Sequence, residues 1–214
     1  MRKSIIIIGA GPGISTAIAE KFGQKEYQVG LISRDTTKGD QLIQNLSAHG
    51  ITSFFEAADA GDLVALQQAL TKLSVRLGGV DMLIYNAAAL KSKDILLESG
   101  EQLTNDFRVN VAAALESVKI LYKDLKKNHG AVLFTGGGLA THPHPQYGSL
   151  SIGKAGLRSL ALQLHDRLKQ DLIYVGLLTI TQSVTTDNPV YSPAIMAEQF
   201  WKMHEERIQA ELVL

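Results

Sequence analysis

Apolar and polar positions along this chain alternate in blocks, and the shortest blocks are almost wholly apolar. Residues 4–8 read Ser-Ile-Ile-Ile-Ile, a run typical of a strand buried on both faces of a parallel sheet. Longer segments with apolar residues at helical spacing lie between such runs, with Asp62 and Gly78 at the ends of one of them. The pattern predicts strands at 4–8, 27–33, 52–57, 80–85, 131–135, 173–178 and 211–214, and helices at 13–24, 37–49, 62–77, 101–127, 149–169 and 193–206.

Each predicted strand except the last is followed by a predicted helix. This order predicts an α/β fold: a Rossmann-type, doubly wound parallel sheet of about seven strands with helices on both faces. Residues 1–214 are long enough for one such domain, and no linker divides them. In this architecture ligands bind at the carboxyl ends of the strands, so candidate chemistry is sought there.

Composition excludes several classes of function. Hydrophobic residues make up 45% of the chain, and 21 basic residues balance 21 acidic ones, so nothing favours nucleic acid or an anionic membrane as a partner. No stretch has the length of a membrane span. There is no cysteine, which excludes disulfides and cysteine metal sites and permits a reducing compartment. We therefore expect a cytoplasmic protein without a metal.

The first strand end carries a glycine-rich turn. Gly9, Gly11 and Gly13 follow the isoleucine run directly, and Ile14 begins the next helix. Glycines let backbone N–H groups approach a pyrophosphate, and a helix N-terminus carries partial positive charge. The turn predicts a dinucleotide site; the alternative is an ordinary strand-to-helix turn.

The second strand end suggests which dinucleotide binds. Ser33 occupies the place where an acidic residue would bind the ribose hydroxyls of NAD, and Arg34 follows it. A guanidinium beside an uncharged residue suits the 2′-phosphate of NADP. We therefore expect NADP(H) to be preferred over NAD(H). The alternatives are that Arg34 is a solvated surface residue or that it pairs with Asp35.

Taken together, these segments resemble the short-chain dehydrogenase/reductase family over nearly the whole chain. The matching segments are Gly9-x-x-x-Gly13-x-Ser15, with Ser15 in place of a third glycine, Asn86-Ala87 after the fourth strand, and Ser151 to Leu157 around Lys154. The resemblance implies that Asn86 and Ala87 lie against the cofactor ribose and that Lys154 binds the nicotinamide ribose. It also implies that Asn110 holds a water in the proton relay and that Asp59 touches the adenine, for which a turn or capping role is the alternative.

The sequence departs from the family where the family places its catalytic Ser and Tyr. Gly137 stands at the Ser position and Leu150 at the Tyr position, four residues before Lys154. Losing a positioned general acid typically costs ~10²–10⁴-fold in rate. Tyr147, seven residues before Lys154, is a possible substitute acid, although about 10 Å of helix axis would separate the two. His142, His144 and Thr135 are also near, and the alternative for Tyr147 is aromatic packing at a helix head.

Three functions remain open from the sequence. The first is an NADP(H)-dependent oxidoreductase that transfers hydride to or from a small carbonyl or alcohol substrate. The second is a catalytically silent NADP(H)-binding regulator, and the third a structural subunit with a vestigial pocket. Residues 193–214 are expected to close the pocket. The family resemblance also implies a homodimer or homotetramer formed through the helices at 101–127 and 149–169, whose apolar residues could equally pack on the sheet.

Overall fold

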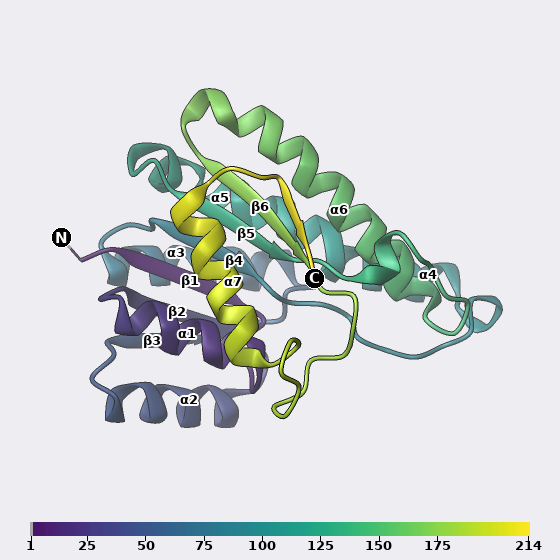
Figure 1. The fold of residues 1–214 in the computed structure, drawn as a ribbon, viewed down its shortest axis with the longest axis horizontal. Coiled ribbons are helices and arrows are strands. Elements are labelled where there is room, and N and C mark those ends of the chain that lie inside the picture. The colour runs from purple at the N-terminus through teal and green to yellow at the C-terminus, as the bar shows by residue number, and fades with distance from the viewer. Residues whose placement is uncertain (1) are drawn as a thin grey trace.

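Seven strands form one parallel sheet in the order β3-β2-β1-β4-β5-β6-β7, which confirms the predicted fold class (Figure 1). The computed structural model describes residues 2–214. The strands are β1 (Ser4–Ile8), β2 (Gln28–Ser33), β3 (Ser53–Ala57), β4 (Met82–Tyr85), β5 (Ala131–Thr135), β6 (Tyr174–Thr179) and β7 (Glu211–Val213). The helices are α1 (Ile14–Gln24), α2 (Thr36–Ala48), α3 (Leu63–Leu77), α4 (Gly100–Phe107), α5 (Ala113–Lys127), α6 (Gly148–Leu168) and α7 (Pro193–Glu206).

The strand order reverses between β1 and β4. From β1 the chain builds outward to β2 and β3, and it then returns to place β4 on the other side of β1. Such a switch point leaves a crevice at the carboxyl ends of the two strands, where ligands bind in doubly wound sheets. The turns after β1 and β4 are therefore neighbours, although 77 positions separate Gly9 from Asn86 in the sequence.

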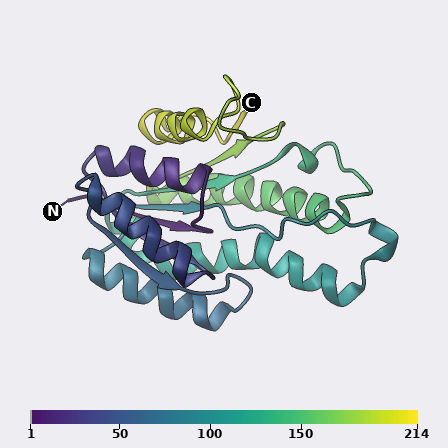
Figure 2. The ribbon, with the colours of Figure 1, turned by 90° about the horizontal axis from the view of Figure 1, so that it is seen from below.

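Alternating side chains of each strand feed two separate cores. Ile5 and Ile7 face the core shared with α1, α2 and α7, whereas Ile6 and Ile8 face the core shared with α3, α5 and α6. Figure 2 shows the two helical layers on opposite sides of the sheet. All four isoleucines are at most 1% exposed, which explains why β1 is continuously apolar rather than alternating.

The long helix predicted at 101–127 is interrupted. It consists of α4 and α5 joined by a π-helical turn, Arg108–Ala112, in which Asn110 is buried. A π turn inserts one extra residue into an α-helix and is found frequently at functional sites. The apolar periodicity of the segment runs through the turn, so the sequence does not reveal it.

Helix α7 packs mainly against α1 rather than over the strand ends. Trp201 meets the ring of Phe22 edge-on at 5.1 Å, and Phe200 and Met203 are buried in the same core. Pro193, the first residue of α7, lines a pocket at the strand ends. Closure of the pocket by residues 193–214 stays a prediction.

Most apolar residues that were expected to form an oligomer interface on α5 and α6 are buried in the core of the protein. Ala113, Ala114, Val118, Leu157 and Ala161 are at most 3% exposed and belong to the core under α5 and α6. The alternative, packing on the sheet, therefore accounts for them, and the oligomeric state stays a prediction. Within residues 2–214, none of the helices has the length and apolarity that a bilayer crossing requires.

Candidate functional site

The glycine turn after β1 is held close to the turn after β4. Gly9 has a φ of +85°, and a Cβ at this position would lie 2.4 Å from the backbone nitrogen of Ala87, so only glycine fits. Ser15, at the place of the family's third glycine, donates a hydrogen bond to the Gly9 carbonyl (2.8 Å) and accepts one from the Asn86 amide (2.8 Å). Ser15 thus supplies a polar link between the two turns in place of a close helix–strand contact.

The start of α1 offers backbone donors that no side chain occupies. Gly13, the residue before the helix, has a φ of +93° and makes no capping hydrogen bond, and the first turn of α1 contains no acidic residue. A Cβ built on Gly11 or Gly13 would meet nothing within 4 Å. The predicted anion site, with Gly9, Gly11, Gly13 and Ile14, is therefore open at a helix N-terminus.

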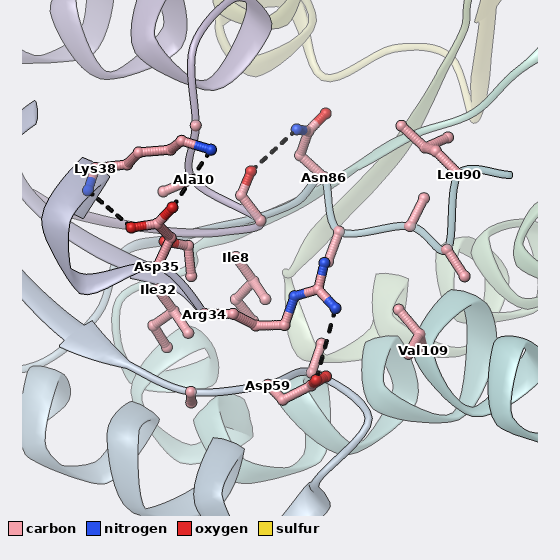
Figure 3. Close-up of a pocket in the computed structure, with 18 of the residues that line it drawn as sticks. Ile8, Ala10, Ile32, Arg34, Asp35, Lys38, Asp59, Asn86, Leu90 and Val109 are labelled. Carbon is pink, nitrogen blue, oxygen red and sulfur yellow. Dashed lines mark hydrogen bonds and ion pairs between the residues drawn. The ribbon is translucent and has the colours of Figure 1, made fainter.

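A pocket of about 630 Å³ extends from this turn toward β2 and β3 (Figure 3). Arg34 lies on its wall, and its guanidinium is 3.8 Å from the carboxylate of Asp59 rather than paired with Asp35. Both partners of this ion pair are largely exposed, and such pairs contribute only about 0–1 kcal/mol. The guanidinium can therefore leave Asp59 for a stronger anion without a large energetic cost.

Asp35 has a different partner because it caps α2. Its side chain accepts a hydrogen bond from the Lys38 backbone N–H (3.0 Å) and pairs with the Lys38 ammonium at 3.3 Å. The backbone hydrogen bond from Lys38 is the main cause that lowers the pKa of Asp35. Lys38 also lines the pocket, and sequence reasoning missed it. Its position three residues after Asp35, an aspartate directly before the predicted helix 37–49, is the signal that could have found it.

Ser33, Asp59, Asn86 and Ala87 all line the same pocket. One carboxylate oxygen of Asp59 accepts a hydrogen bond from the Gly61 N–H at 2.7 Å. This oxygen has the turn role that was the alternative to adenine contact. The other oxygen faces Arg34. The structure thus brings together the predicted nucleotide residues of four different strand ends.

A second pocket of about 1,060 Å³ adjoins the first along Pro12, Asn86, Ala88 and Leu90, which line both. Lys154 lies in its wall and donates a hydrogen bond to the Thr135 carbonyl at 2.8 Å. Burial lowers the pKa of Lys154 to about 8, because a low-dielectric environment disfavours the ammonium. The walls of this pocket also include Gly137 and Leu150, at the places of the family's Ser and Tyr.

Tyr147 is brought into the same pocket as Lys154. It precedes the first residue of α6 and is 40% exposed, with the His144 ring 5.9 Å away. His142 lines the pocket as well, and its ring lies 3.0 Å from the Thr141 hydroxyl in a hydrogen bond. The wall around these polar groups is largely apolar and includes Leu90, Leu150 and Ile180.

Asn110 lies behind the pocket wall. Its side-chain oxygen accepts a hydrogen bond from the Ala89 N–H at 2.8 Å, and its amide nitrogen is buried without a partner. A Cβ on Gly153 would come within 2.3 Å of that nitrogen, so Asn110 fills the space between the turn after β4 and α6. Tyr85, the last residue of β4, donates a hydrogen bond to the Val109 carbonyl in the same π turn.

Comparison with known proteins adds to this geometry. The family model described as short chain dehydrogenase matches residues 3–188. An uncharacterized oxidoreductase of Thermotoga maritima is 26% identical over 163 residues, which are 76% of this chain and 64% of that protein. Carbonyl reductase family member 4 of Xenopus laevis is 23% identical over 172 residues, 78% of this chain and 71% of that protein. The chain therefore matches slightly less than two thirds of the Thermotoga relative.

Solved structures share the whole fold. An alcohol dehydrogenase from Thermococcus sibiricus, complexed with 5-hydroxy-NADP, superposes with a TM-score of 0.86 at 21% identity, over 99% of this chain and 95% of that one. A short chain dehydrogenase from Burkholderia cenocepacia, in complex with NADP, gives a TM-score of 0.90 at 21% identity, over 99% and 96%. At these identities the likeness concerns the fold.

Proposed function

Because the chain belongs to the short chain dehydrogenase family, we propose that it is an NADP(H)-dependent oxidoreductase acting on a small carbonyl or alcohol substrate. The observation that carries the proposal is the continuity of the two pockets. The first contains the glycine turn up to Pro12 and the cations Arg34, Lys38 and Lys91. The second contains Gly13 and Ile14 at the open start of α1, together with Lys154 and Tyr147. A dinucleotide needs such an arrangement, with a phosphate site between a base pocket and a reaction pocket.

The residues present fit a nicotinamide dinucleotide. We assign its pyrophosphate to the N-terminus of α1 and the turn formed by Gly9, Gly11, Gly13 and Ile14, where no side chain caps the helix. Asn86 and Ala87 are assigned to its ribose and Asp59 to its adenine, since all three line the first pocket. Two of the relatives of known structure were solved with NADP or a derivative of it, which supports a nucleotide of this class here.

The preference for NADP(H) rests on Arg34 and Lys38. Both side chains line the base end of the first pocket, and Ser33, the last residue of β2, carries no charge. Each cation faces an exposed carboxylate, Asp59 at 3.8 Å and Asp35 at 3.3 Å. A phosphate dianion binds a guanidinium and an ammonium more strongly than these carboxylates do, so we expect it to displace both ion pairs.

Catalysis is assigned to Tyr147 and Lys154. When bound, the reduced nicotinamide supplies a hydride to the carbonyl carbon. We assign to the Tyr147 hydroxyl the donation of a proton to the carbonyl oxygen. A Lys154 ammonium in the same pocket favours the phenolate that remains. Leu90, Leu150 and Ile180 keep water from the reacting atoms, and Asn110 supports Lys154 by filling the space beneath α6.

Calorimetric titration with NADPH and, separately, NADH tests the cofactor assignment. We expect tight NADPH binding, and a loss of about tenfold in NADPH affinity for Arg34→Ala and for Lys38→Ala, with NADH affinity unchanged in both. Lys72→Ala, on the exposed face of α3, is the matched control. No binding of either nucleotide to the wild-type protein would refute the proposal, and equal losses for both nucleotides would refute the role of the two cations.

Turnover tests the catalytic assignment. With NADPH and the carbonyl probes benzaldehyde, 2,3-butanedione and menadione, we expect Tyr147→Phe to lower kcat by about 10²-fold or more and to leave NADPH affinity unchanged. His142→Gln is the matched variant, since His142 lines the same pocket. Full activity of Tyr147→Phe together with inactivity of His142→Gln would assign the proton donor to the histidine instead.

The quaternary state and location are part of the same proposal. Leu115 on α5 and Ile152 on α6 are 36% and 40% exposed, and they remain available to a second copy after the other apolar residues of these helices are buried. We propose a homodimer or homotetramer in the cytoplasm. Light scattering coupled to size exclusion, with Leu115→Lys as the disrupting variant, tests the assembly, and fractionation of the source cells tests the location.

A further inference from the structure

The segment that holds Tyr147 is not the helix itself. Tyr147 stands before the first turn of α6 with a φ of −128° and a ψ of 45°, and its side chain caps nothing. The Tyr147 carbonyl accepts the first hydrogen bond of α6, from the Ser151 N–H at 2.8 Å, but the φ and ψ of a residue at this position are not those of the helix. Other contacts must therefore determine where the Tyr147 hydroxyl lies.

Those contacts come from residues 91–98, which we call the strap. Figure 1 shows the connection that leaves β4 extending past the sheet to α4 and the start of α6. The strap forms an isolated parallel bridge, Lys93 with Tyr147, and the Gly148 N–H donates to the Lys93 carbonyl at 3.2 Å. The Ile95 N–H donates to the Pro145 carbonyl at 2.9 Å. A Cβ on Gly148 would lie 2.7 Å from the end of the Ile95 side chain, so the two segments are in close contact.

A cluster of charges fastens the strap to α4 and α6. Glu98, at the end of the strap, has a side chain only 2% exposed, and it pairs with Lys91 at 3.2 Å and Lys93 at 3.6 Å. Lys91 also pairs with Asp106 of α4 at 2.6 Å. Ser149, the second residue after Tyr147, donates to Glu98 (3.2 Å) and to Asp106 (2.6 Å). Two carboxylates thus meet two ammonium groups and one buried hydroxyl.

The ion pairs of this cluster contribute more to the geometry of the segment than to the stability of the chain. An ion pair with a buried partner contributes little to stability on balance, because desolvation offsets the attraction; here the Glu98 side chain is 2% exposed, whereas those of Lys91 and Lys93 are 32% and 30% exposed. Such pairs do impose a specific geometry, since each buried charge must keep its partners. Here the charges fix Ser149 from one side and the Lys93 backbone from the other, and Tyr147 lies between those two anchors.

We infer that Glu98 is a positioning residue, which fixes Tyr147 in the reaction pocket through Ser149 and Lys93. The inference rests on the proposed function, in which Tyr147 donates the proton. A misplacement of about 1 Å can cost about 10²-fold in rate, so loss of Glu98 is expected to lower kcat without contact between Glu98 and the substrate.

The test uses Glu98→Gln and Ser149→Ala in the full chain. Glu98→Gln keeps the shape and removes the charge. Ser149→Ala removes the two hydrogen bonds but leaves both carboxylates paired with lysines, so it stays informative if Glu98→Gln folds poorly. Glu116→Gln is the matched control, because Glu116 pairs with Lys119 on the exposed face of α5.

The first readout needs neither cofactor nor substrate. The chain has six tyrosines, and ¹⁹F spectra of protein labelled with 3-fluorotyrosine give one resonance for each, with that of Tyr147 assigned from Tyr147→Phe. We expect Glu98→Gln and Ser149→Ala to shift or broaden the Tyr147 resonance and to leave those of the buried Tyr27 and Tyr174 in place. An unchanged Tyr147 resonance in both variants would overturn the inference.

The second readout is kinetic. With NADPH and the three carbonyl probes, we expect kcat to fall about tenfold or more in Glu98→Gln, with NADPH affinity within twofold of the wild type. A purely structural role would lower the melting temperature and leave kcat unchanged, which would also overturn the inference. Wild-type protein that turns over no probe would refute the proposed function instead, and the ¹⁹F spectra would still decide the role of Glu98.

Discussion

The packing of His204 makes a quantitative prediction about the pH dependence of folding. His204 of α7 is 4% exposed, its Nε2 and the Tyr27 hydroxyl are 2.8 Å apart in a hydrogen bond, and its Nδ1 has no partner. Burial, and secondarily the charges of Arg207 and Lys3, lower the pKa of His204 to about 4 from the usual 6.5. The folded protein therefore excludes the imidazolium that the unfolded chain forms.

The sign and size of the effect follow from linkage. Because the folded-state pKa of His204 lies below its unfolded value, the stabilisation is complete above pH 6.5 and is lost as the pH falls from 6.5 toward 4. Between these values the unfolded chain binds one proton more than the folded chain, so the free energy of unfolding falls by up to about 1.4 kcal/mol per pH unit. The total loss at pH 4 is about 3 kcal/mol.

Urea unfolding followed by tryptophan fluorescence measures this loss. The chain has a single tryptophan, Trp201, whose ring lies 5.7 Å from that of His204, so the probe reports on the same contact. The glutamine in His204→Gln cannot take up a proton. Between pH 6.5 and 4, the free energy of unfolding of the wild type is therefore expected to fall about 3 kcal/mol further than that of His204→Gln. His49→Gln, at the exposed end of α2, should follow the wild type. Parallel curves for wild type and His204→Gln would refute the reasoning.

Further perturbations test other parts of the site. Gly9→Ala forces a side chain into the left-handed region and against the Ala87 backbone at 2.4 Å, so we expect a fall in melting temperature and loss of NADPH binding, measured by differential scanning fluorimetry with and without nucleotide. Lys154→Met should raise the melting temperature of the nucleotide-free protein at pH 7 while weakening NADPH binding. The pKa of Lys154 is lowered to about 8 from 10.5, so the charge destabilises the fold below pH 8, and the gain should shrink between pH 8 and 10.5. Arg158→Gln removes the 2.7 Å ion pair that joins α6 to Glu211 of β7, and faster hydrogen exchange in β7 with unchanged exchange in β1 is expected.

The sequence predicts the framework of this fold because its signals are local. Four isoleucines in β1 and a glycine turn specify a buried strand and its exit without reference to the rest of the chain. Asp62, predicted at the start of a helix, caps α3 in the structure. The alternation of strands and helices predicts a parallel sheet with right-handed crossovers, whereas the order of the strands is known only from the structure.

The partners of charged residues could not be predicted in the same way. Arg34 has Asp35 beside it in the sequence, yet its ion pair is with Asp59, 25 positions away. Asp35 is already engaged as the cap of α2, and capping holds its carboxylate toward Lys38. The partner of the Arg34 guanidinium depends on which carboxylate already accepts a backbone hydrogen bond. The order of residues in the sequence does not show which carboxylate that is.

The displaced tyrosine illustrates the same limit at the reaction pocket. Counting along a helix separates Tyr147 from Lys154 by about 10 Å, and this count assumes that both residues belong to α6. In the structure α6 begins at Gly148, so Tyr147 belongs to the incoming loop and lines the same pocket as Lys154. Because its φ and ψ lie outside the helix, the tyrosine needs contacts from another segment, and we propose that Glu98, about fifty positions earlier, provides them through Ser149. Since the proposed acid and its proposed positioning residue act together, a tyrosine at the place of Tyr147 and an acidic residue at the place of Glu98 are expected to occur together among proteins of this family.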